Sequence, residues 1–274
     1  MGKGYQRWKD SRKRGSVFER LSCEYAELLD IEGDLNDRDL KDVIEIDYYR
    51  LIDQKIIIDL VKAVEQRTLS EGEITKLCRE RNQSYWHAEF EHLYTAVEVA
   101  SQFLSQLEAI EFNMSNSSDA VHSYIRRWFK IDQMYRKFIY ALKSSGQMTL
   151  LSNLTDKIEG LYTNSFLNPL ATQWQGEVDK MDSWSVPDTE PQQGFYSRWV
   201  KPYRDRGKKI CVIISDALRY EAAEEMVNRI NRENKYQATI NHMLSGLPSY
   251  TQLGMASLLP NNGNELSISE ADSS

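Results

Sequence analysis

The stretch Lys209-Ile210-Cys211-Val212-Ile213-Ile214-Ser215-Asp216-Ala217-Leu218-Arg219-Tyr220-Glu221 decides the expected fold of the carboxyl-terminal part of the chain. Ile210 to Ile214 is an unbroken apolar run between polar residues, which is typical of a central parallel strand covered on both faces. Asp216 follows the run and falls at the carboxyl end of the predicted strand, where open α/β sheets bind their ligands. From Leu218 to Asn231 the apolar spacing becomes that of a helix.

A second strand is predicted at residues 236–245, after this helix. Two strands joined through a helix form a right-handed crossover unit in which the strands run parallel. The carboxyl ends of parallel strands open onto one edge of the sheet. Residues that follow the two strands are therefore expected to lie close together, although they are far apart in the sequence.

The stretch Leu247-Pro248-Ser249-Tyr250-Thr251-Gln252 follows the second predicted strand. Ser249 and Gln252 have capping-box spacing, so we expect a helix that starts at Ser249 and has Thr251 in its first turn. First-turn amides and the helix dipole favour negative charge, such as an attacking alkoxide or a bound phosphate. Asp216 and Thr251 thus form a candidate metal-and-nucleophile pair. Two simpler interpretations stay open: Asp216 caps its own helix, and Thr251 is an ordinary first-turn polar residue.

Residues 17–181 show the apolar spacing of helices almost throughout, which predicts an amphipathic helical bundle. Gly, Pro and Ser/Asn-rich breaks divide this part into segments. The expected boundaries are a break at Gly33-Asp34, helix starts at Asp37, Ser84, Ser118 or Asp119, and Thr149, a polar break at 113–118, a stop at Ser144-Ser145-Gly146 and a bend at Pro169.

The expected domains are a helical domain at 1–181, a linker at 182–206 and a truncated α/β domain at 207–274. The linker assignment rests on Pro187 and Pro191 among polar residues. The expected fold class is therefore a mostly α-helical bundle, followed by the first part of an α/β domain with parallel strands and a crossover helix.

The composition is that of a globular protein: of 274 residues, 41% are hydrophobic and 27% are charged. No apolar run reaches the ~18 residues needed to span a bilayer, so we expect no membrane contact. A net charge of −7 argues against a protein that coats nucleic acid. Three widely spaced cysteines indicate a reducing compartment and exclude a zinc cluster of thiolates. We expect a cytoplasmic protein, because no apolar segment of a secretory signal follows the basic residues 1–16.

Three features of the helical part are interpreted as structural. The basic residues 1–16, which include two aromatic side chains, are read as a solvated segment in preference to a phosphate-binding arm. His87 and His92 are five residues apart, whereas metal ligands on one helix face are four apart. The aromatic residues between Trp128 and Tyr135 are interpreted as core in preference to a base-stacking platform.

Several motifs together resemble a known family. The run Val-Ile-Ile-Ser-Asp-Ala-Leu-Arg-Tyr-Glu spans Val212 to Glu221, Phe195-Tyr196 precedes it, and Leu-Pro-Ser-Tyr-Thr at 247–251 and Leu-Leu-Pro at 258–260 follow it. This combination is similar to the PglZ family of BREX bacteriophage-defence systems, within the alkaline-phosphatase-like superfamily. The similarity covers about residues 195–260, and the helical part only loosely resembles the region upstream of that domain.

The resemblance implies a metal-dependent phosphatase or phosphodiesterase. In that superfamily the aspartate after the first strand binds a divalent metal, and a Ser or Thr that opens a helix is the metal-bound nucleophile. Asp216 would thus be a metal ligand, and Thr251 the nucleophile that forms a phosphothreonine before water releases the phosphate. Two Zn²⁺ ions are implied for the intact protein. Arg219, Glu221 and Ser249 are candidates for supporting roles, the substrates would be phosphoesters of DNA or nucleotides, and the partners would be other BREX proteins.

The sequence also departs from the family pattern. Such sites use further Asp and His ligands from later strands, but only the polar residues 261–274 follow Pro260, and they contain no histidine. His242, on the second predicted strand, does not match a ligand position. We therefore expect a fragment of a longer protein, which exposes apolar sheet edges and has little hydrolase activity by itself.

Two other functions compete with a hydrolase. In the first, the long helical region is an interaction surface in a multiprotein defence complex, and the phosphatase-like part is a non-catalytic scaffold. In the second, Asp216 is the phosphoacceptor of a receiver-type domain. The second is set aside, because the acidic pair that should precede the strand is absent from the sequence.

Overall fold

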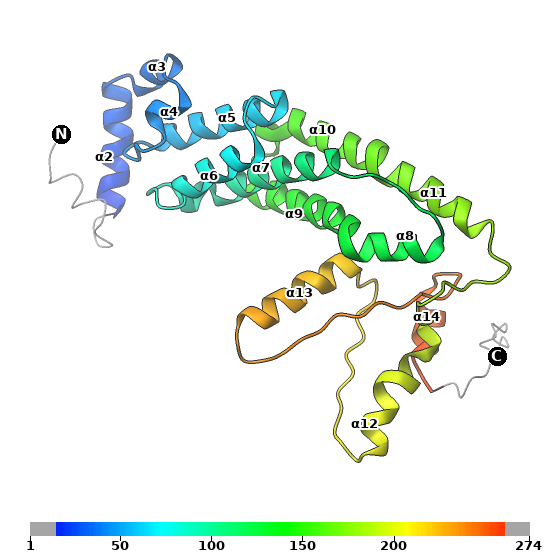
Figure 1. Cartoon of the computed structure of the whole chain (residues 1–274). Helices are drawn as coiled ribbons and strands as arrows, with labels where there is room; N and C mark the ends of the chain where they lie inside the picture. Colours follow the sequence, from blue (N-terminus) through cyan, green and yellow to red (C-terminus); the bar gives the residue numbers. More distant parts are fainter. Residues whose placement is uncertain (1–14, 261–274) are drawn as a thin grey trace, which may run out of the picture. The chain divides into compact units, whose positions relative to one another are not determined.

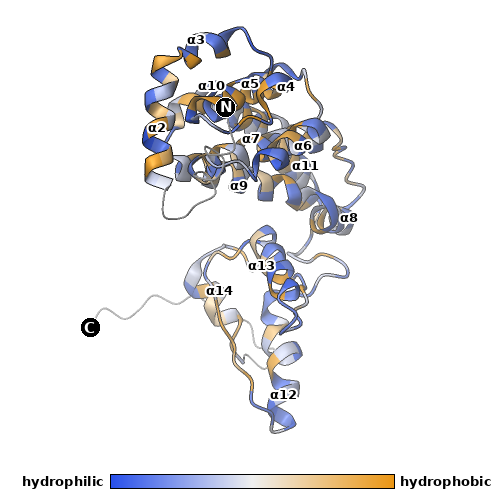
Figure 2. Cartoon of the chain, turned by 90° about the vertical axis from the view of Figure 1, so that its left-hand side faces the viewer, coloured by the Kyte–Doolittle hydropathy of each residue, from blue (hydrophilic) through white to orange (hydrophobic). Residues whose placement is uncertain are grey.

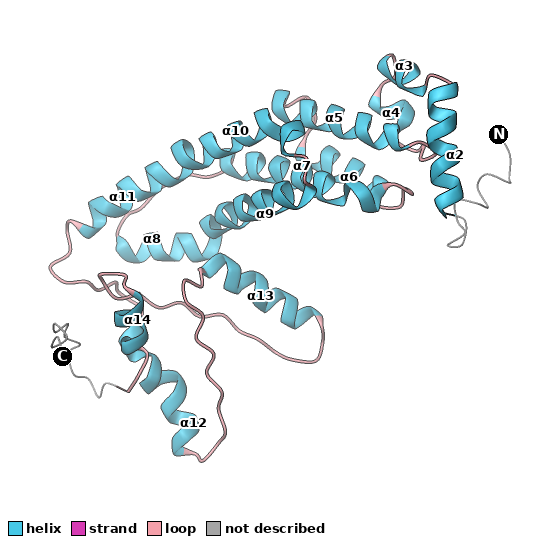
Figure 3. Cartoon of the chain, turned by 180° about the vertical axis from the view of Figure 1, so that it is seen from behind, coloured by secondary structure: helices cyan, strands magenta, loops and turns pink. Residues whose placement is uncertain are grey.

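The computed structural model describes residues 15–260, and all regular elements in this range are helices (Figure 3). The range divides into two compact units: residues 15–110 with 131–167, and residues 111–130 with 168–260. The mostly helical character predicted from the sequence is confirmed. The basic residues 3–14 and the polar tail 261–274 lie outside the described residues. Within that range, no helix combines the length and apolar content required to cross a bilayer.

The first unit is a bundle of helices (Figure 1). Its long helices each carry an apolar and a polar face (Figure 2), and α7 packs against both α5 and α6. The elements are α2 (Gly15–Leu28), α3 (Ile31–Asn36), α4 (Leu40–Val43), α5 (Arg50–Gln66), α6 (Glu71–Arg81), α7 (His87–Glu108), most of α9 (Phe129–Ser145), the 3₁₀ turn η2 (Met148–Leu151), α10 (Ser152–Leu161) and the π-helical η3 (Tyr162–Leu167).

The core of this bundle comes from side chains at helix spacing, as the sequence predicted. α7 supplies the largest share, since it is contacted on two sides. Its buried residues include Phe90, Leu93, Val97, Phe103 and Leu104, which meet Ile52, Ile56, Ile57 and Leu60 of α5 and Ile74 of α6 in the same core.

A buried ion pair joins three helices within this core. Asp53 is 0% exposed and Arg81 is 1% exposed. The guanidinium donates to both carboxylate oxygens, at 3.2 Å from Nε and 2.6 Å from Nη2. Its Nη1 donates to the carbonyls of Ile44 and Ile46 at 2.8 and 2.9 Å, and the Tyr94 hydroxyl donates to Asp53 at 2.6 Å. The charges are thus fully hydrogen-bonded, which is the condition for burying them.

The second unit contains shorter helices. Its elements are α8 (Ser117–Ser123), the π-helical η1 (Tyr124–Trp128), α11 (Asn168–Val178), the 3₁₀ turn η4 (Gln192–Gly194), the π-helical η5 (Tyr196–Val200), α12 (Lys201–Asp205), α13 (Tyr220–Arg232) and α14 (Thr251–Ser257). Tyr220 anchors α13 in this unit. Its ring meets those of Tyr124 and Phe129 with centroids 6.3 and 5.4 Å apart, and its hydroxyl donates to the Ile125 carbonyl at 3.3 Å.

The predicted strands are not formed in the described residues, which show no α/β part. Residues 210–214 are a loop, and their apolar side chains are exposed, Ile213 by 89% (Figure 3). Residues 236–245 do not pair with them; Leu244 forms an isolated parallel bridge with Pro191. A strand needs adjacent strands that hydrogen-bond to its N–H and C=O groups. Without such strands, an apolar run remains exposed to solvent.

Several helix boundaries predicted from the sequence are wrong. Asp37, expected to start a helix, is the C-cap of α3, and α4 begins at Leu40. The expected break at Gly33-Asp34 lies inside α3, because the chain turns earlier, at Asp30, whose φ is 48°. The next helix after the polar break is capped by the Asn116 side chain, which accepts from the Asp119 amide at 2.8 Å. Ser118 and Asp119 are therefore not the cap.

α6 is absent from the sequence-based prediction. Its signal was present as a capping box, because the Ser70 hydroxyl accepts from the Glu73 amide at 3.3 Å and Glu73 accepts from the Ser70 amide at 2.9 Å. The helix expected from Ser84 begins at His87, after the turn that follows α6. The predicted stop at Ser145 is confirmed, and Gly146 follows it with a φ of 66°.

The cysteines should differ sharply in reactivity. Burial raises the pKa of the Cys78 thiol to about 12, whereas Cys23 and Cys211 are exposed. Since the thiolate is the reactive species, Cys23 and Cys211 should react with an aromatic disulfide reagent at pH 8 at least ~100-fold faster than Cys78. Cys78 should react only when the first unit unfolds. Labelling followed by peptide mass spectrometry, with and without urea, measures this; equal rates for all three thiols would contradict it.

Candidate functional site

The structure brings Asp216 and Thr251 together. The Thr251 Oγ1 donates to Asp216 Oδ2 at 3.4 Å, although 35 residues separate them in the sequence. Both side chains are exposed to solvent. The distance is longer than the ~2.7–2.8 Å of a good hydroxyl–carboxylate hydrogen bond. The contact is therefore loose, and both residues are accessible to solvent.

Asp216 does not cap the helix that follows it. α13 begins at Tyr220 with Arg219 at its N-cap, and no side chain caps this end. Ala217 separates Asp216 from that helix and has a φ of 53°, in the left-handed region that costs an L-residue roughly 1–2 kcal/mol. The turn at Ala217 directs the chain away from a helical path, so the simple capping interpretation of Asp216 is wrong.

Thr251 is the first residue of α14, and its backbone setting differs from the expected one. The N-cap is Tyr250, and no side chain caps this helix. The predicted capping box of Ser249 and Gln252 is thus not formed, and Ser249 is exposed before the helix. With seven residues, α14 is two turns long, so its dipole contributes little to the charge preference at Thr251.

Arg219 and Glu221, the other candidate supporting residues, lie at the start of α13. Arg219 is exposed, and its carbonyl accepts from the amides of Ala222 and Ala223 at 3.1 Å. Glu221 is 0% exposed. Glu221 is thus fully buried whereas Asp216 is exposed, which suits Glu221 to a structural role better than to contact with a substrate in water.

The oxygens of Asp216 and Thr251 fit a divalent cation as a partial ligand set. Two oxygens bound at ~2.1 Å to one tetrahedral cation lie about 3.4 Å apart, which is the separation found here. A complete site needs three or four protein ligands, and residues 15–260 hold no group of three His, Cys, Asp or Glu side chains that would bind a metal. The remaining ligands would have to come from other residues.

The histidines are placed in packing contacts. His87 stacks on Tyr94 with ring centroids 5.5 Å apart, and His92 meets Tyr140 edge-on at 6.4 Å, as expected for structural residues. In the second unit, the rings of His122 and His242 are 6.1 Å apart, and the buried His242 Nε2 has no hydrogen-bond partner. Burial, and then the nearby His122, lowers the pKa of His242, so the ring stays neutral at physiological pH.

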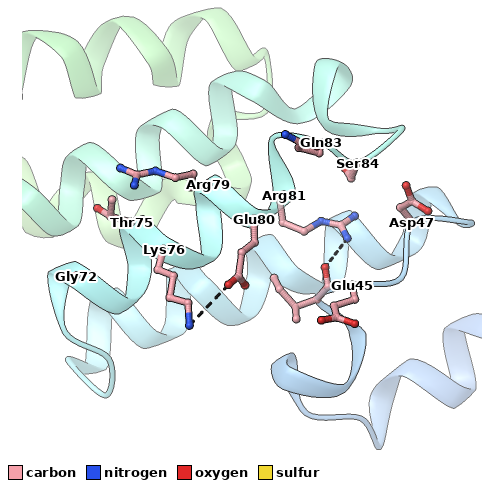
Figure 4. Close-up of a pocket in the computed structure, with 11 residues that line it drawn as sticks. Glu45, Asp47, Gly72, Thr75, Lys76, Arg79, Glu80, Arg81, Gln83 and Ser84 are labelled. Carbon is pink, nitrogen blue, oxygen red and sulfur yellow. Dashed lines mark hydrogen bonds and ion pairs between the residues drawn. The ribbon is translucent and has the colours of Figure 1, made fainter.

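A pocket of about 680 Å³ lies in the first unit, which does not contain Asp216 or Thr251 (Figure 4). Its wall carries charges of both signs, such as Lys76 and Glu80, which pair at 3.8 Å. Arg81 also lines it, but its guanidinium is occupied by Asp53 and two carbonyls. Ser84, another lining residue, donates its hydroxyl to Asp53 at 3.4 Å, but that carboxylate is buried and already accepts from Arg81 and Tyr94.

Comparison with known proteins gives the relatives of the chain. Residues 195–273 match the family model described as the BREX system PglZ alkaline phosphatase-like domain. The chain is 32% identical over 250 residues to the alkaline phosphatase-like protein PglZ of Bacillus cereus (strain H3081.97), covering 89% of the chain and 29% of that protein. It is 35% identical over 268 residues to the alkaline phosphatase-like protein BrxZ of Escherichia coli O9:H4 (strain HS), covering 92% of the chain and 31% of that protein.

No solved structure matches the chain. The chain spans about 30% of the length of the curated relatives that it matches, which agrees with the expectation of a piece of a longer protein. The similarity extends well beyond residues 195–260 and includes the helical part, where the sequence alone indicated only a loose resemblance. Residues 195–273 are thus a PglZ alkaline phosphatase-like domain of the BREX type, within a chain that is similar to PglZ and BrxZ over about 90% of its length.

Proposed function

We propose that Asp216 and Thr251 are part of a metal-dependent phosphoester hydrolase site that acts in BREX anti-phage defence. The observation that carries this proposal is the 3.4 Å contact between Thr251 Oγ1 and Asp216 Oδ2. Membership in an alkaline phosphatase-like family supports the reaction class. Asp216 would bind a divalent cation, Thr251 would be the nucleophile, and other BREX proteins would be the partners.

The chemistry proposed for Thr251 is a two-step phosphoryl transfer. In the first step its Oγ1 forms a bond to phosphorus, the bond to the leaving alcohol breaks, and the hydroxyl proton is lost to a nearby base. In the second step water cleaves the phosphothreonine and regenerates the hydroxyl. A bound zinc ion would supply charge stabilisation and lower the pKa of the threonine hydroxyl. The chain's own contribution is to hold the carboxylate and the hydroxyl next to each other.

We further propose that residues 207–274 begin an α/β domain, after a helical domain at 1–181 and a connection at 182–206. The exposed apolar run at 210–214 supports this proposal, because such side chains need a covering layer. Residues beyond the described range would add neighbouring strands and the missing metal ligands. By itself, the chain should therefore show little hydrolase activity; robust turnover of a phosphodiester that Thr251→Ala abolishes would contradict this.

The metal content of a longer protein, extended to the length of the curated relatives, tests the role of Asp216. We expect Asp216→Asn to lower tightly bound zinc by about one equivalent, because a neutral amide replaces an anionic ligand. The matched control is Asp205→Asn, an exposed aspartate in α12 of the same unit. Elemental analysis after dialysis measures the loss. Unchanged zinc in Asp216→Asn would overturn the proposed ligand role.

A non-catalytic scaffold is the second candidate function. It is favoured by the first unit, which buries a core of its own although hydrolysis at Asp216 and Thr251 would not need it. In this alternative, phage restriction survives Thr251→Ala but fails when the helical unit is deleted. A hydrolase predicts that restriction is lost with Thr251→Ala.

A further inference from the structure

Residues 184–192 form hydrogen bonds to the chain just before the segment that carries Thr251. The Gln192 amide donates to the Leu244 carbonyl, and the Leu244 amide donates to the Glu190 carbonyl, each at 2.8 Å. The Trp184 indole donates to the Ser245 carbonyl at 2.7 Å. These three hydrogen bonds, from Trp184, Glu190 and Gln192, anchor the chain immediately before the loop that leads to Thr251.

The Gln192 side chain then spans this loop. Its Oε1 accepts from the Gly246 amide at 3.2 Å, and its Nε2 donates to the Gly254 carbonyl at 3.2 Å. Gly246 precedes Thr251 by five residues, and Gly254 follows it by three. One amide group therefore ties together the two ends of the segment that presents the threonine. Both of its hydrogen-bonding functions are used, which fixes the orientation of the amide.

Few other contacts are available to hold Thr251 in place. α14 has seven residues, lacks a side-chain N-cap and exposes Thr251. A helix this short is not stable without tertiary contacts. The Gly254 carbonyl lies in its last turn, and it also accepts from the Ser257 hydroxyl at 2.7 Å. Gln192 and Ser257 together satisfy a carbonyl that the end of a helix leaves open.

We infer that Gln192 is a positioning residue that sets the place of Thr251 opposite Asp216. Asp216 is on a separate loop that precedes α13, so their 3.4 Å separation depends on how the Thr251 segment is anchored. Gln192 bonds to both ends of the Thr251 segment, so removing its two side-chain bonds breaks this link between residues 246 and 254. The positional part of this inference stands on the contacts alone, and its catalytic consequence rests on the proposed function.

Amide exchange tests the anchoring in the chain of 274 residues. In Gln192→Leu, the Gly246 amide loses its acceptor, and we expect it to exchange about 10-fold faster. In Gln192→Glu, a carboxylate oxygen keeps the acceptor, so Gly246 should stay protected, while the amides of α14 exchange faster because the donor to Gly254 is lost. The matched control is Gln175→Leu, which removes a side-chain bond to Asp179 elsewhere in the unit and should change neither.

A cysteine cross-link tests the position of Thr251 without any need for activity. In a Cys23→Ser and Cys211→Ser background, Asp216→Cys and Thr251→Cys should form a disulfide under mild oxidation, because the replaced side chains are in contact. Adding Gln192→Leu should lower the cross-linking rate at least about 5-fold, since the loop then samples a wider range of positions. Gln175→Leu should leave the rate unchanged.

The outcomes separate this inference from the proposed function. If Gln192→Leu changes neither Gly246 exchange nor the cross-linking rate, the positioning role is overturned, whatever the activity of the longer protein. If both change but the longer protein hydrolyses no phosphoester, the positioning role stands and the proposed function fails. If hydrolysis is found, Gln192→Leu should lower kcat and leave KM nearly unchanged, and Gln192→Glu should fall between it and the wild type.

Discussion

Thr251→Ala is expected to lower kcat for phosphodiester hydrolysis by ~10⁴-fold or more in a protein with the length of the curated relatives, as loss of a nucleophile does in other covalent mechanisms. The reason is that alanine offers no oxygen to attack phosphorus, and the 3.4 Å partner of Asp216 is removed. KM should change little, because the substrate is held mainly by other groups. Steady-state kinetics with a chromogenic phosphodiester and added Zn²⁺ measures the effect.

Two controls keep this prediction specific. Thr251→Ser retains the hydroxyl and should retain measurable turnover and formation of a phosphorylated intermediate, whereas Thr251→Ala should form none. Tyr250→Phe alters the exposed neighbouring residue without touching the hydroxyl of Thr251 and should leave kcat near that of the wild type. Equal activity in Thr251→Ala and the wild type would remove threonine from the mechanism.

Arg81→Ala is expected to destabilise the first unit by ~3–5 kcal/mol, because it leaves the Asp53 carboxylate buried without its counter-ion. Asp53 is 0% exposed and would keep only hydroxyl donors, chiefly Tyr94 at 2.6 Å. The carbonyls of Ile44 and Ile46 would lose their donor in the same variant. The midpoint of urea unfolding, followed by circular dichroism, measures the change in the free energy of unfolding.

Two further variants provide smaller expected losses of stability for comparison with Arg81→Ala. Tyr94→Phe removes one hydrogen bond to a charged group and should cost about 1.5–3 kcal/mol. Lys76→Ala breaks an exposed pair with Glu80 and should cost about 1 kcal/mol or less. If Arg81→Ala were no more destabilising than Lys76→Ala, the ion pair would not stabilise the bundle as proposed.

Tyr94 adds a pH dependence to the same cluster. Burial, and then the Asp53 charge, raises the pKa of the Tyr94 hydroxyl above its ordinary value. A raised pKa in the folded state means that the stabilisation is fully present below the ordinary tyrosine pKa of ~10 and is lost as pH rises above it. Stability of the wild type should therefore decline above pH ~10 more steeply than that of Tyr94→Phe.

Much of the helical unit could be predicted from local patterns. The stripes that contain Phe18, Phe90 and Phe138 identify core residues, because helix spacing decides which side chains share a face. Errors arose where side chains compete for the ends of a helix. The caps of α3 and α8 are Asp30 and Asn116, whereas the sequence pattern predicted a break at Gly33-Asp34 and a cap at Ser118 or Asp119. Only the surrounding packing selects among such caps.

The strand content of the carboxyl-terminal part could not be predicted from local patterns. An apolar run such as Ile210–Ile214 predicts a strand only if neighbouring strands are present, and the described residues provide none. Strands pair with residues that are distant in the sequence. An apolar run therefore forms a strand only where such partner strands are present. The proximity of Asp216 and Thr251 was nevertheless predicted correctly, although the crossover unit from which it was derived is not formed.

The sequence by itself determined the family, the helical character and the two oxygen-bearing residues at the candidate site, because each depends on local motifs and spacing. Tertiary structure decided which charges are buried as a pair, where Asp216 lies relative to Thr251, and that Gln192 spans the loop between Gly246 and Gly254. No local pattern singles out Gln192 in Pro191-Gln192-Gln193. Its partners are 54 and 62 residues away, and contacts at that separation exist only once the chain has folded.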